Sequence, residues 1–316
     1  MKVLGIDIGG TKCAVILGEF ADNRMQILKK SVCATDHTVS PNEMIMRLCS
    51  MADELTDNTE IDAIGISCGG PLDSQKGIIL SPPNLPGWDY VPICEIIKQR
   101  YKVDVKLQND ANACAVAEWK FGAGKGSSNM VFLTFGTGLG AGLILNGQLY
   151  SGTNGNAGEV GHIRLSDNGP VGYGKSGSFE GFCSGGGLAQ LGYSMALESI
   201  QTGKIPLYCN DCADISKIDA KSIALAANAG DTTALKVFEF CGRYLGKGIS
   251  MLIDILNPEK IVIGSIYARQ EQLLVKYMQQ SINEEALSAS AACCCVVPAA
   301  LGEQIGDYAA LGVALL

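Results

Sequence analysis

One pattern occurs twice in the sequence: an apolar run, a glycine turn and a second apolar run. The first copy is VLGIDI-GGTK-CAVILG over residues 3–18, and the second is VFLTF-GTGLG-AGLIL over residues 131–145. Short apolar runs joined by glycines predict a β-hairpin in each place. The copies lie about one domain length apart. The repetition therefore indicates a duplicated fold with a nucleotide held between two similar halves.

Predicted strands and helices alternate along the rest of the chain. Strands are expected at residues 61–67, 103–109 and 260–265, and helices at 111–122, 234–256 and 307–316. The turn Asn146-Gly147 predicts a further short strand, QLY, directly after the second hairpin. Strands that alternate with helices favour an α/β fold.

Composition excludes several function classes. The 316 residues carry a formal net charge of −8 and no block of Lys and Arg, so we expect no nucleic-acid partner. No apolar run reaches membrane-spanning length and the N-terminus does not read as a signal peptide, so we expect a cytoplasmic protein without a membrane partner.

The 13 cysteines are then expected to be free thiols, since the cytoplasm is reducing. Cys293, Cys294 and Cys295 precede two valines, and we interpret them as small apolar residues of a strand. Cys209 and Cys212 have metal-like spacing, but a lone CxxC is a weak zinc signal.

The two glycine turns are candidate phosphate sites. Glycine lets backbone N–H groups approach a phosphate closely, and Thr11 and Thr137 add hydroxyl donors. Tight structural hairpins are the alternative, although two matched turns favour phosphate. The run Gly136–Ala141 also fits the dinucleotide fingerprint GxGxxA, but that fingerprint needs a helix next and a strand is predicted here.

Two acidic residues stand at the ends of predicted strands. Asp7 lies beside the first turn, where it could serve near a cation or simply form the turn. Asp110 begins a predicted helix, where it could be an N-cap or the base that takes a proton from a sugar hydroxyl. Strand ends in α/β folds are common ligand sites, and the residues alone leave both alternatives open.

The run Gly158-Glu159-Val160-Gly161-His162 holds one of only two histidines in the chain. Taken alone, His162 is explained well as a satisfied core residue. The glycine-rich stretch before it suggests instead a tight ligand-shaped loop, in which Glu159 and His162 would both hydrogen-bond neighbouring hydroxyls. The other histidine, His37, lies in a polar stretch and has no assigned role.

Together these segments resemble the ROK family (repressor, open reading frame, kinase), within the superfamily of sugar kinases, actin and heat-shock ATPases. The resemblance covers essentially the whole chain, and the order and spacing of its motifs are specific. The segments that carry it are DIGGTK (7–12), GISCGGPLD (65–73), PNLPGW (83–88), QNDANA (108–113), FGTGLGAG (135–142), GEVGH (158–162), NPEKIVIGS (257–265) and GDYAALGVA (306–314).

The resemblance implies an actin-like or hexokinase-type ATPase fold, with two α/β domains around a central cleft. We expect the first domain to take residues 1–120 plus 302–316 and the second to take 121–301.

The resemblance also implies a role for each motif. Asp110 is the expected catalytic base. The expected sugar-binding residues are Gly69, Gly70, Asn84, Asn109, Asp110, Glu159, His162 and Glu180. The expected ATP-binding residues are Asp7, near Mg²⁺, with Gly9, Gly10, Thr11, Gly136, Thr137, Gly138 and Gly264. The role of Lys12 stays open.

One motif departs from the family pattern. Most members bind a structural zinc through the histidine of the GH motif and three cysteines. Here His162 is present, but Gly or Ser stands where the thiolates belong, in the segment 172–180. Zinc prefers thiolate or imidazole ligands, so we expect no structural zinc at this place. The departure leaves the placement of Glu180 open, because zinc normally orders that loop.

The resemblance therefore implies an ATP- and Mg²⁺-dependent kinase of a free hexose, with glucose phosphorylated at O6 as the first expectation and a homodimer as the assembly. N-acetylmannosamine, allose, fructose or a β-glucoside are alternative substrates. A sugar-responsive repressor and a sugar sensor without kinase activity are alternatives of another class. A repressor of this family would need an N-terminal helix-turn-helix, for which the residues before Asp7 are too few.

Overall fold

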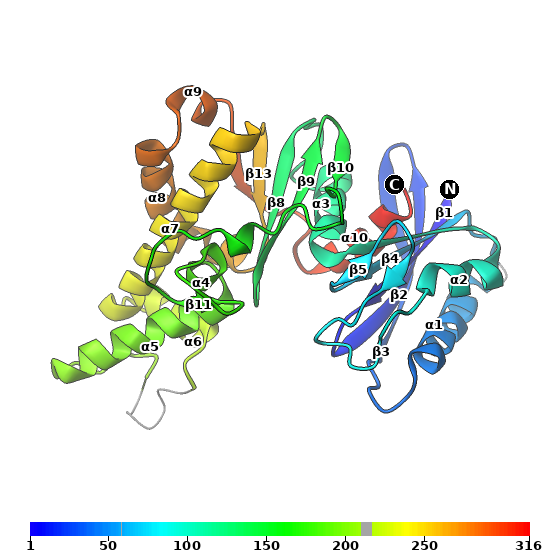
Figure 1. The fold of residues 1–316 in the computed structure, drawn as a ribbon, viewed down its shortest axis with the longest axis horizontal. Helices are drawn as coiled ribbons and strands as arrows, with labels where there is room; N and C mark the ends of the chain where they lie inside the picture. Colours follow the sequence, from blue (N-terminus) through cyan, green and yellow to red (C-terminus); the bar gives the residue numbers. More distant parts are fainter. Residues whose placement is uncertain (58, 210–216) are drawn as a thin grey trace. The chain divides into compact units, whose positions relative to one another are not determined.

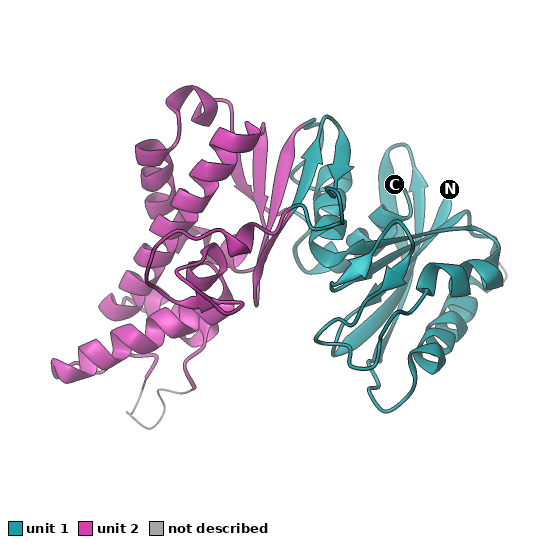
Figure 2. Ribbon diagram, viewed as in Figure 1, with its two compact units in different colours: residues 1–128, 142–157, 300–316 teal, residues 129–141, 158–299 magenta. Residues whose placement is uncertain are grey.

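The computed structural model describes residues 1–57, 59–209 and 217–316 (Figure 1). The chain forms two compact units (Figure 2). Unit 1 comprises residues 1–128, 142–157 and 300–316, and unit 2 comprises 129–141 and 158–299. The domain limits expected from the sequence stay a prediction.

Unit 1 is built on a five-stranded sheet with strand order β3-β2-β1-β4-β7. Strands β1, β2 and β3 are antiparallel neighbours, whereas β1, β4 and β7 run parallel. The strands of this sheet are β1 (Lys2–Ile8), β2 (Lys12–Ala21), β3 (Arg24–Ala34), β4 (Ala63–Cys68) and β7 (Asp104–Asn109). The first predicted hairpin is thereby confirmed.

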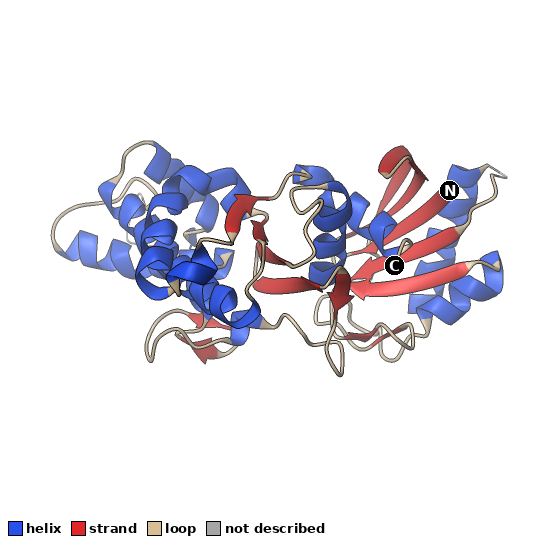
Figure 3. Cartoon of the chain, turned by 90° about the horizontal axis from the view of Figure 1, so that it is seen from above, coloured by secondary structure: helices blue, strands red, loops and turns tan. Residues whose placement is uncertain are grey.

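Unit 1 also contains helices. Figure 3 shows the helices and strands of the chain in different colours. They are α1 (Pro41–Thr56), α2 (Ile93–Tyr101), α3 (Asp110–Phe121) and α10 (Ile305–Val313), the last preceded by the turn η3 (Gly302–Gln304). The short strands are β5 (Leu72–Asp73), β6 (Ile78–Ile79) and β10 (Gln148–Tyr150). Helix α1 begins with a capping box, in which Ser40 and Glu43 exchange side-chain and backbone hydrogen bonds.

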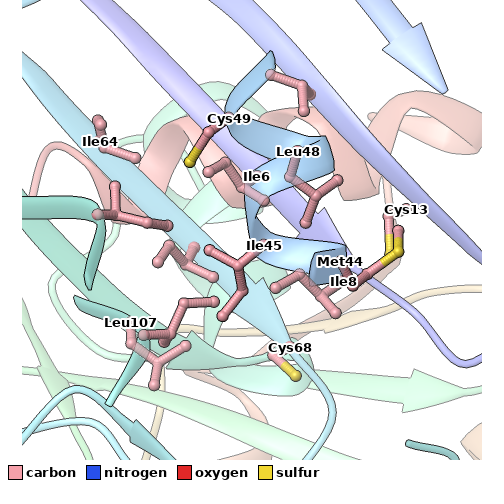
Figure 4. Close-up of a cluster of buried hydrophobic side chains, with 14 of the residues drawn as sticks. Ile6, Ile8, Cys13, Met44, Ile45, Leu48, Cys49, Ile64, Cys68 and Leu107 are labelled. Carbon is pink, nitrogen blue, oxygen red and sulfur yellow. The ribbon is translucent and has the colours of Figure 1, made fainter. Parts of the chain in front are cut away.

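The alternation of side chains along β1 divides the core of unit 1 into two layers. Leu4, Ile6 and Ile8 face a cluster that includes Met44, Ile45 and Leu48 of α1 (Figure 4). Val3 lies on the opposite face, in a cluster with Ala310 and Leu311 of α10. Sequence-distant α10 therefore covers one face of the sheet and brings the end of the chain back to its beginning.

Glycine makes the contact between α10 and the sheet very close. A Cβ atom added to Gly65 in β4 would lie 2.2 Å from the carbonyl oxygen of Ala310. No other residue fits there without displacing the helix backbone. The N-terminus of α10 is consequently held near the ends of β1 and β4.

Unit 2 combines strands with most of the remaining helices. Its sheet has the order β10-β9-β8-β13-β14, and β9 continues from unit 2 into unit 1. The strands are β8 (Met130–Phe135), β9 (Leu139–Leu145), β13 (Lys260–Ile263) and β14 (Cys295–Pro298), with a separate pair formed by β11 (Val171–Gly172) and β12 (Lys175–Ser176). The helices are η1 (Val160–His162), α4 (Phe179–Phe182), α5 (Gly185–Gln201), α6 (Ala220–Asn228), α7 (Thr232–Leu256), α8 (Ile266–Glu285) and α9 (Ser288–Ala291).

The structure corrects the interpretation of the three consecutive cysteines. Only Cys295 lies in a strand; Cys293 belongs to the turn before it, and Cys294 connects the two. Cys293 and Cys295 are exposed. The strand was expected two residues too early because cysteine is compatible with both a turn and a strand. Among the described residues, no helix is long and apolar enough to span a membrane.

The first prediction concerns Glu118, a fully buried carboxylate in α3. It accepts backbone N–H bonds from Ala123, Ala300 and Leu301 at 2.7, 3.2 and 2.9 Å, and so ties α3 to the segment that enters α10. Glu118→Ala would leave these donors unpaired and should lower the free energy of unfolding by about 3 kcal/mol, measured by urea denaturation.

Glu118→Gln, which keeps one acceptor oxygen, should lose less, and Glu54→Ala at an exposed position of α1 is the control. A Glu118→Ala midpoint equal to that of the control would contradict the role of Glu118.

Candidate active site

The parallel strands of unit 1 end together and place the first group of candidate residues at one edge of the sheet. In their register, Ile8 of β1 pairs with Cys68 of β4, and Cys68 pairs with Asn109 of β7. The residues that follow these three are Gly9, Gly69 and Asp110. Asp7 lies one residue inside the same edge. Residues far apart in the sequence therefore meet at the carboxyl ends of the strands, where α/β folds bind ligands.

The first glycine turn is a tight, well-anchored loop. The N–H of Gly9 donates to the carbonyl of Lys12 at 3.1 Å, and the hydroxyl of Thr35 donates to the carbonyl of Gly9 at 2.6 Å. The carbonyl of Gly10 lies 2.8 Å from Nε2 of His37. Thr11 is exposed at the tip of the turn. His37, which had no role in the sequence analysis, thus contacts a candidate phosphate turn.

Asn84 joins this turn to the loop after β4. A Cβ atom on Gly10 would lie 2.7 Å from the backbone oxygen of Asn84, and one on Gly69 would lie 3.5 Å from its Nδ2. The segments PNLPGW and GISCGGPLD therefore meet beside the first turn. The structure brings Asn84, Gly69 and Gly70 to the same edge as Asp7 and Asp110.

Asn109, not Asp110, caps helix α3. The side-chain oxygen of Asn109 accepts the N–H of Asn112 at 2.8 Å, and Asp110 is the first helical residue. The N-cap alternative for Asp110 is therefore wrong. Its carboxylate accepts the N–H of Ala111 at 2.8 Å, and solvent still reaches the residue although protein surrounds much of the carboxyl group.

The pKa of Asp110 is raised above its ordinary value. Desolvation by the surrounding protein is the main cause, and the bond from Ala111 opposes it. A carboxylate with a raised pKa accepts a proton more readily than one with an ordinary pKa, which is the property required of a general base.

The pKa of the Asp7 carboxyl group is also raised. Burial, followed by the charges of Asp307 and Asp110, raises it from 3.8 to about 6 against the opposing charges of Lys30 and Lys12. Oδ2 of Asp7 also lies close to the N-terminus of α10, since a Cβ on Gly306 would be 3.2 Å from it. The positive end of that helix favours the charged carboxylate.

Lys30 and Asp307 belong to this edge but were missed by the sequence analysis. Nζ of Lys30 lies 2.7 and 2.8 Å from the two carboxylate oxygens of Asp307, which is buried. The motif GDYAALGVA contains Asp307 and signalled the helix, but nothing in it indicated a charged partner 277 residues away. Only the contact of α10 with the sheet brings the two together.

Unit 2 contains a cavity of about 690 Å³ that begins at the second glycine turn. Its lining residues are Gly136, Thr137, Gly185, Gly186, Asp219, Ala220, Lys221, Ala224, Leu225, Ser265, Ile266, Arg269 and Gln270. The cavity is large enough for a nucleoside, and its lining combines apolar side chains with a few polar groups. Two of the three predicted residues of this turn, Gly136 and Thr137, line it.

The N-terminus of α5 lies in this cavity and was also missed. Ser184 caps the helix by accepting the N–H of Gly187 at 3.0 Å, and the N–H of Gly185 donates to the carbonyl of Gly136 at 2.8 Å. The run Ser184-Gly185-Gly186-Gly187 was the available signal, since a capping residue followed by glycines suits a helix start that approaches an anion.

The predicted Gly264 does not line the cavity, whereas its neighbour Ser265 does. Gly264 donates its N–H to the carbonyl of Leu133 at 2.9 Å and packs on Phe132. Ser265 has a φ of 58°, a conformation that normally favours glycine. Ser265 therefore supplies a glycine-like backbone conformation at the border of the cavity.

Glu180 connects the second turn to the GEVGH segment. Its Oε2 accepts the N–H of Leu139 at 3.0 Å, and a Cβ on Gly138 would lie 2.7 Å from that oxygen. A Cβ on Gly161 would lie 3.2 Å from the Cβ of Glu180. Gly138, Glu180 and the short helix η1 therefore lie together. Glu159 and His162, at the two ends of η1, are exposed. The core alternative for His162 is wrong.

The segment in which the family resemblance places zinc ligands does not fit zinc here. Residues 172–180 contain no cysteine or histidine, and the hydroxyl of Ser178 is used as the N-cap of α4. Within residues 1–57, 59–209 and 217–316, no three His, Cys, Asp or Glu side chains gather closely enough to hold a metal ion. The pair Cys209 and Cys212 cannot be assessed, because Cys212 lies outside the described residues.

The second prediction follows from the raised pKa of Asp7. The stability that this carboxyl contributes is complete below pH 3.8 and is lost as the pH rises through about 6, because the folded state holds the proton more tightly. Asp7→Asn removes that loss. The variant should exceed the wild type in free energy of unfolding at pH 7.5, by on the order of 1 kcal/mol after solvent screening.

The difference should shrink towards pH 4, and Asp22→Asn in an exposed turn is the control. A wild type that gains stability relative to Asp7→Asn between pH 4 and 7 would contradict the assignment.

Several known proteins are similar to this chain in sequence and in fold. A glucokinase of Thermotoga maritima is 30% identical over 314 residues, which cover 99% of this chain and 97% of that protein. The DNA-binding transcriptional dual regulator NagC of Escherichia coli is 32% identical over 265 residues, which cover 81% of this chain and 62% of NagC. A crystal structure of a ROK family glucokinase from Streptomyces griseus, in complex with glucose and AMPPNP, matches with a TM-score of 0.77 and 28% identity, over 100% of this chain and 99% of that one.

These similarities identify the architecture as the actin-like ATPase fold of ROK hexokinases, as expected. The relatives include sugar kinases and sugar-responsive regulators, and the full-length matches to glucokinases support a sugar kinase. The ROK family matches residues 3–316, and the chain belongs to this family.

Proposed function

We propose that the protein is an ATP-dependent hexose kinase that phosphorylates free glucose at O6, with Asp110 as the general base. The observation that carries the proposal is the position of Asp110, which follows the end of a strand and has a partly desolvated carboxyl group that does not cap a helix. The glucokinase relatives, which match almost the whole chain, support the same reaction.

Asp110 would accept the proton of the sugar hydroxyl as its oxygen attacks the γ-phosphorus of ATP. The hydroxyl oxygen forms the new bond to phosphorus, the bond to the β-phosphate oxygen breaks, and ADP leaves. Phosphoryl transfer demands chiefly positioning and charge stabilisation. The raised pKa of Asp110 suits it to hold this proton.

The cavity of unit 2 would bind the nucleoside part of ATP. Its volume of about 690 Å³ and the helix N-terminus at Gly185 suit a nucleoside with an adjoining anion. The turns at Gly9–Thr11 and Gly136–Gly138 would present backbone N–H groups to phosphate oxygens. The structure of the Streptomyces griseus glucokinase contains glucose and the ATP analogue AMPPNP, which supports ATP as the phosphoryl donor.

Asp7 would be the protein ligand closest to Mg²⁺. Its pKa is raised partly by two neighbouring carboxylates, a repulsion that a divalent cation relieves. The lack of a three-residue metal cluster in the described part of the chain fits Mg²⁺, which commonly binds through one or two carboxylates, substrate phosphates and water. When bound, Mg²⁺ supplies charge neutralisation on the phosphates.

Glu159, His162 and Glu180 of unit 2, with Gly69, Gly70, Asn84 and Asn109 of unit 1, are the proposed sugar-binding residues. Carboxylate, imidazole and amide groups pair well with vicinal hydroxyls. They suit glucose, and also N-acetylmannosamine, allose, fructose or a β-glucoside, which differ in the arrangement of one or a few groups. Glucose is the first choice because the full-length relatives are glucokinases.

A sugar-sensing protein without kinase activity is the candidate of another class. The similarity to NagC over 81% of this chain favours it. Such a protein would bind sugar, and would show either DNA binding or ATP hydrolysis without sugar phosphate.

A sugar panel with Mg-ATP tests the proposal. Purified protein would be assayed against glucose, mannose, fructose, allose, N-acetylglucosamine, N-acetylmannosamine and cellobiose, with sugar phosphate as the readout and the phosphorylated position read by ³¹P–¹H NMR. We expect glucose to lead in kcat/KM and to carry the phosphate on O6. Another leading sugar would replace the substrate but keep the kinase. Sugar binding without phosphorylation, or a shift of DNA mobility at physiological salt, would favour the sensor.

The third prediction concerns the base itself. Asp110→Asn should lower kcat on the order of 10²-fold or more and leave the KM for sugar close to that of the wild type, because the amide cannot accept the proton. In the wild type, kcat/KM should fall on acidification as Asp110 is protonated, at a pH above the ordinary carboxyl pKa.

Asp104→Asn, at the far end of the same strand, is the matched control and should retain full kcat. Turnover in Asp110→Asn equal to that of this control would exclude Asp110 as the base.

A homodimer and a cytoplasmic location complete the proposal. Both rest on the resemblance to the family. Static light scattering of the purified protein tests the assembly, and the mass of a single chain would contradict a dimer.

A further inference from the structure

A small hairpin lies in the segment where the family resemblance places zinc ligands. Strands β11 and β12 pair Val171 with Ser176 and Gly172 with Lys175. The two residues between them, Tyr173 and Gly174, have φ values of 45° and 76°. Two consecutive positive φ values are typical of a type I′ turn, which matches the twist of a two-residue hairpin. The hairpin is therefore a built element of unit 2.

The tip of this hairpin contacts His162 in two ways. Nζ of Lys175 donates to the backbone carbonyl of His162 at 2.6 Å, a short charge-assisted hydrogen bond. The ring of Tyr173 meets the imidazole edge to face, with ring centroids 5.2 Å apart and an interplanar angle of 86°. One contact holds the backbone of His162 and the other holds its ring.

The hairpin also touches Glu180 and is anchored at its base. A Cβ atom on Gly172 would lie 2.8 Å from the Cβ of Glu180. Gln190 of α5 accepts the N–H of Val171 and donates to its carbonyl, both at 2.8 Å. Arg164 donates to the carbonyl of Ser176 at 2.7 Å. The base is thus fixed by hydrogen bonds, while the tip reaches His162.

Tyr173 adds a physical argument for a role of the tip. It is 79% exposed and has left-handed backbone conformation, which costs a tyrosine more than a glycine or asparagine. Neither core packing nor turn propensity explains a tyrosine at this position. Its ring contact with His162 does.

We propose that the hairpin Val171–Ser176 is a metal-free positioning element for the sugar site, in which Lys175 and Tyr173 hold His162 in place. The inference rests on the proposed function for the contact of His162 with the hexose. The position of His162 relative to the hairpin does not depend on that function and can be measured separately.

The chain has only two histidines, so proton NMR resolves the environment of His162 directly. A His37→Gln background leaves one imidazole, whose Cε1 and Cδ2 protons report the nearby Tyr173 ring. Lys175→Met should shift and broaden these signals, Lys175→Arg should restore them in part, and Tyr173→Leu should remove the ring-current shift. Lys236→Met, an exposed lysine of α7, and Tyr193→Leu, an exposed tyrosine of α5, are the matched controls.

The same substitutions are then made in the protein that retains His37, and steady-state kinetics test their effect on hexose binding. Lys175→Met should raise the KM for hexose about tenfold, as expected for loss of a charge-assisted hydrogen bond, with kcat and the KM for ATP close to wild type. A general loss of folding would instead lower the active fraction and kcat. Circular dichroism checks that each variant is folded. If Lys175→Met is unstable, Tyr173→Leu serves as the second variant, because Tyr173 is exposed.

Unchanged imidazole signals in Lys175→Met and Tyr173→Leu would overturn the proposal, as would an unchanged KM for hexose in both. One zinc per chain, lost in His162→Ala, would overturn its metal-free part. If the wild type phosphorylates no sugar, the proposed function fails, and the NMR comparison still decides whether the hairpin positions His162.

Discussion

Two like charges, Asp7 and Asp110, are held near each other by the parallel strands of unit 1. This arrangement is unfavourable in itself, since the charge of Asp110 opposes ionisation of the partly desolvated Asp7. The register of β1, β4 and β7 enforces it, and burial of the apolar faces of these strands stabilises that register. The core of unit 1 therefore provides the free energy that keeps an electrostatically strained edge in place.

Helix α10 acts on Asp7 in two opposite ways. Its N-terminus lies close to Asp7 and favours the charged carboxylate, whereas the charge of its Asp307 raises the pKa of Asp7. Lys30 from β3 pairs with Asp307 and lowers the pKa of Asp7. The close contact of Gly65 with the helix backbone and the hydrogen bonds of Glu118 decide where α10 lies. Packing far from the edge thus sets the charge balance at Asp7, which links the stability of unit 1 to the proposed metal and phosphate chemistry.

Unit 2 uses backbone groups more than charges. The second glycine turn and the start of α5 border one cavity, and Glu180 fastens Leu139, at the end of that turn, to the element that carries His162. A hairpin with polar anchors lies beside that element, and its Lys175 holds the backbone carbonyl of His162 by a hydrogen bond. The glycines of this segment allow the backbones to approach closely, as Gly172 and Gly181 do.

Local patterns determined much of this protein. Both glycine hairpins, the helices beginning at Asp110 and near Ala234, the ROK motifs and the missing cysteines at 172–180 could be predicted, because each depends on neighbours in the sequence. Tertiary structure alone decided which residues meet. Lys30 reaches Asp307, Asn109 takes the cap that Asp110 could have taken, His162 is exposed, and Ser265 adopts a glycine-like conformation. Hydrogen bonds and charge interactions act over a few ångströms in space. Separation along the sequence does not predict them, because only the packing of the strands and α10 brings these groups together.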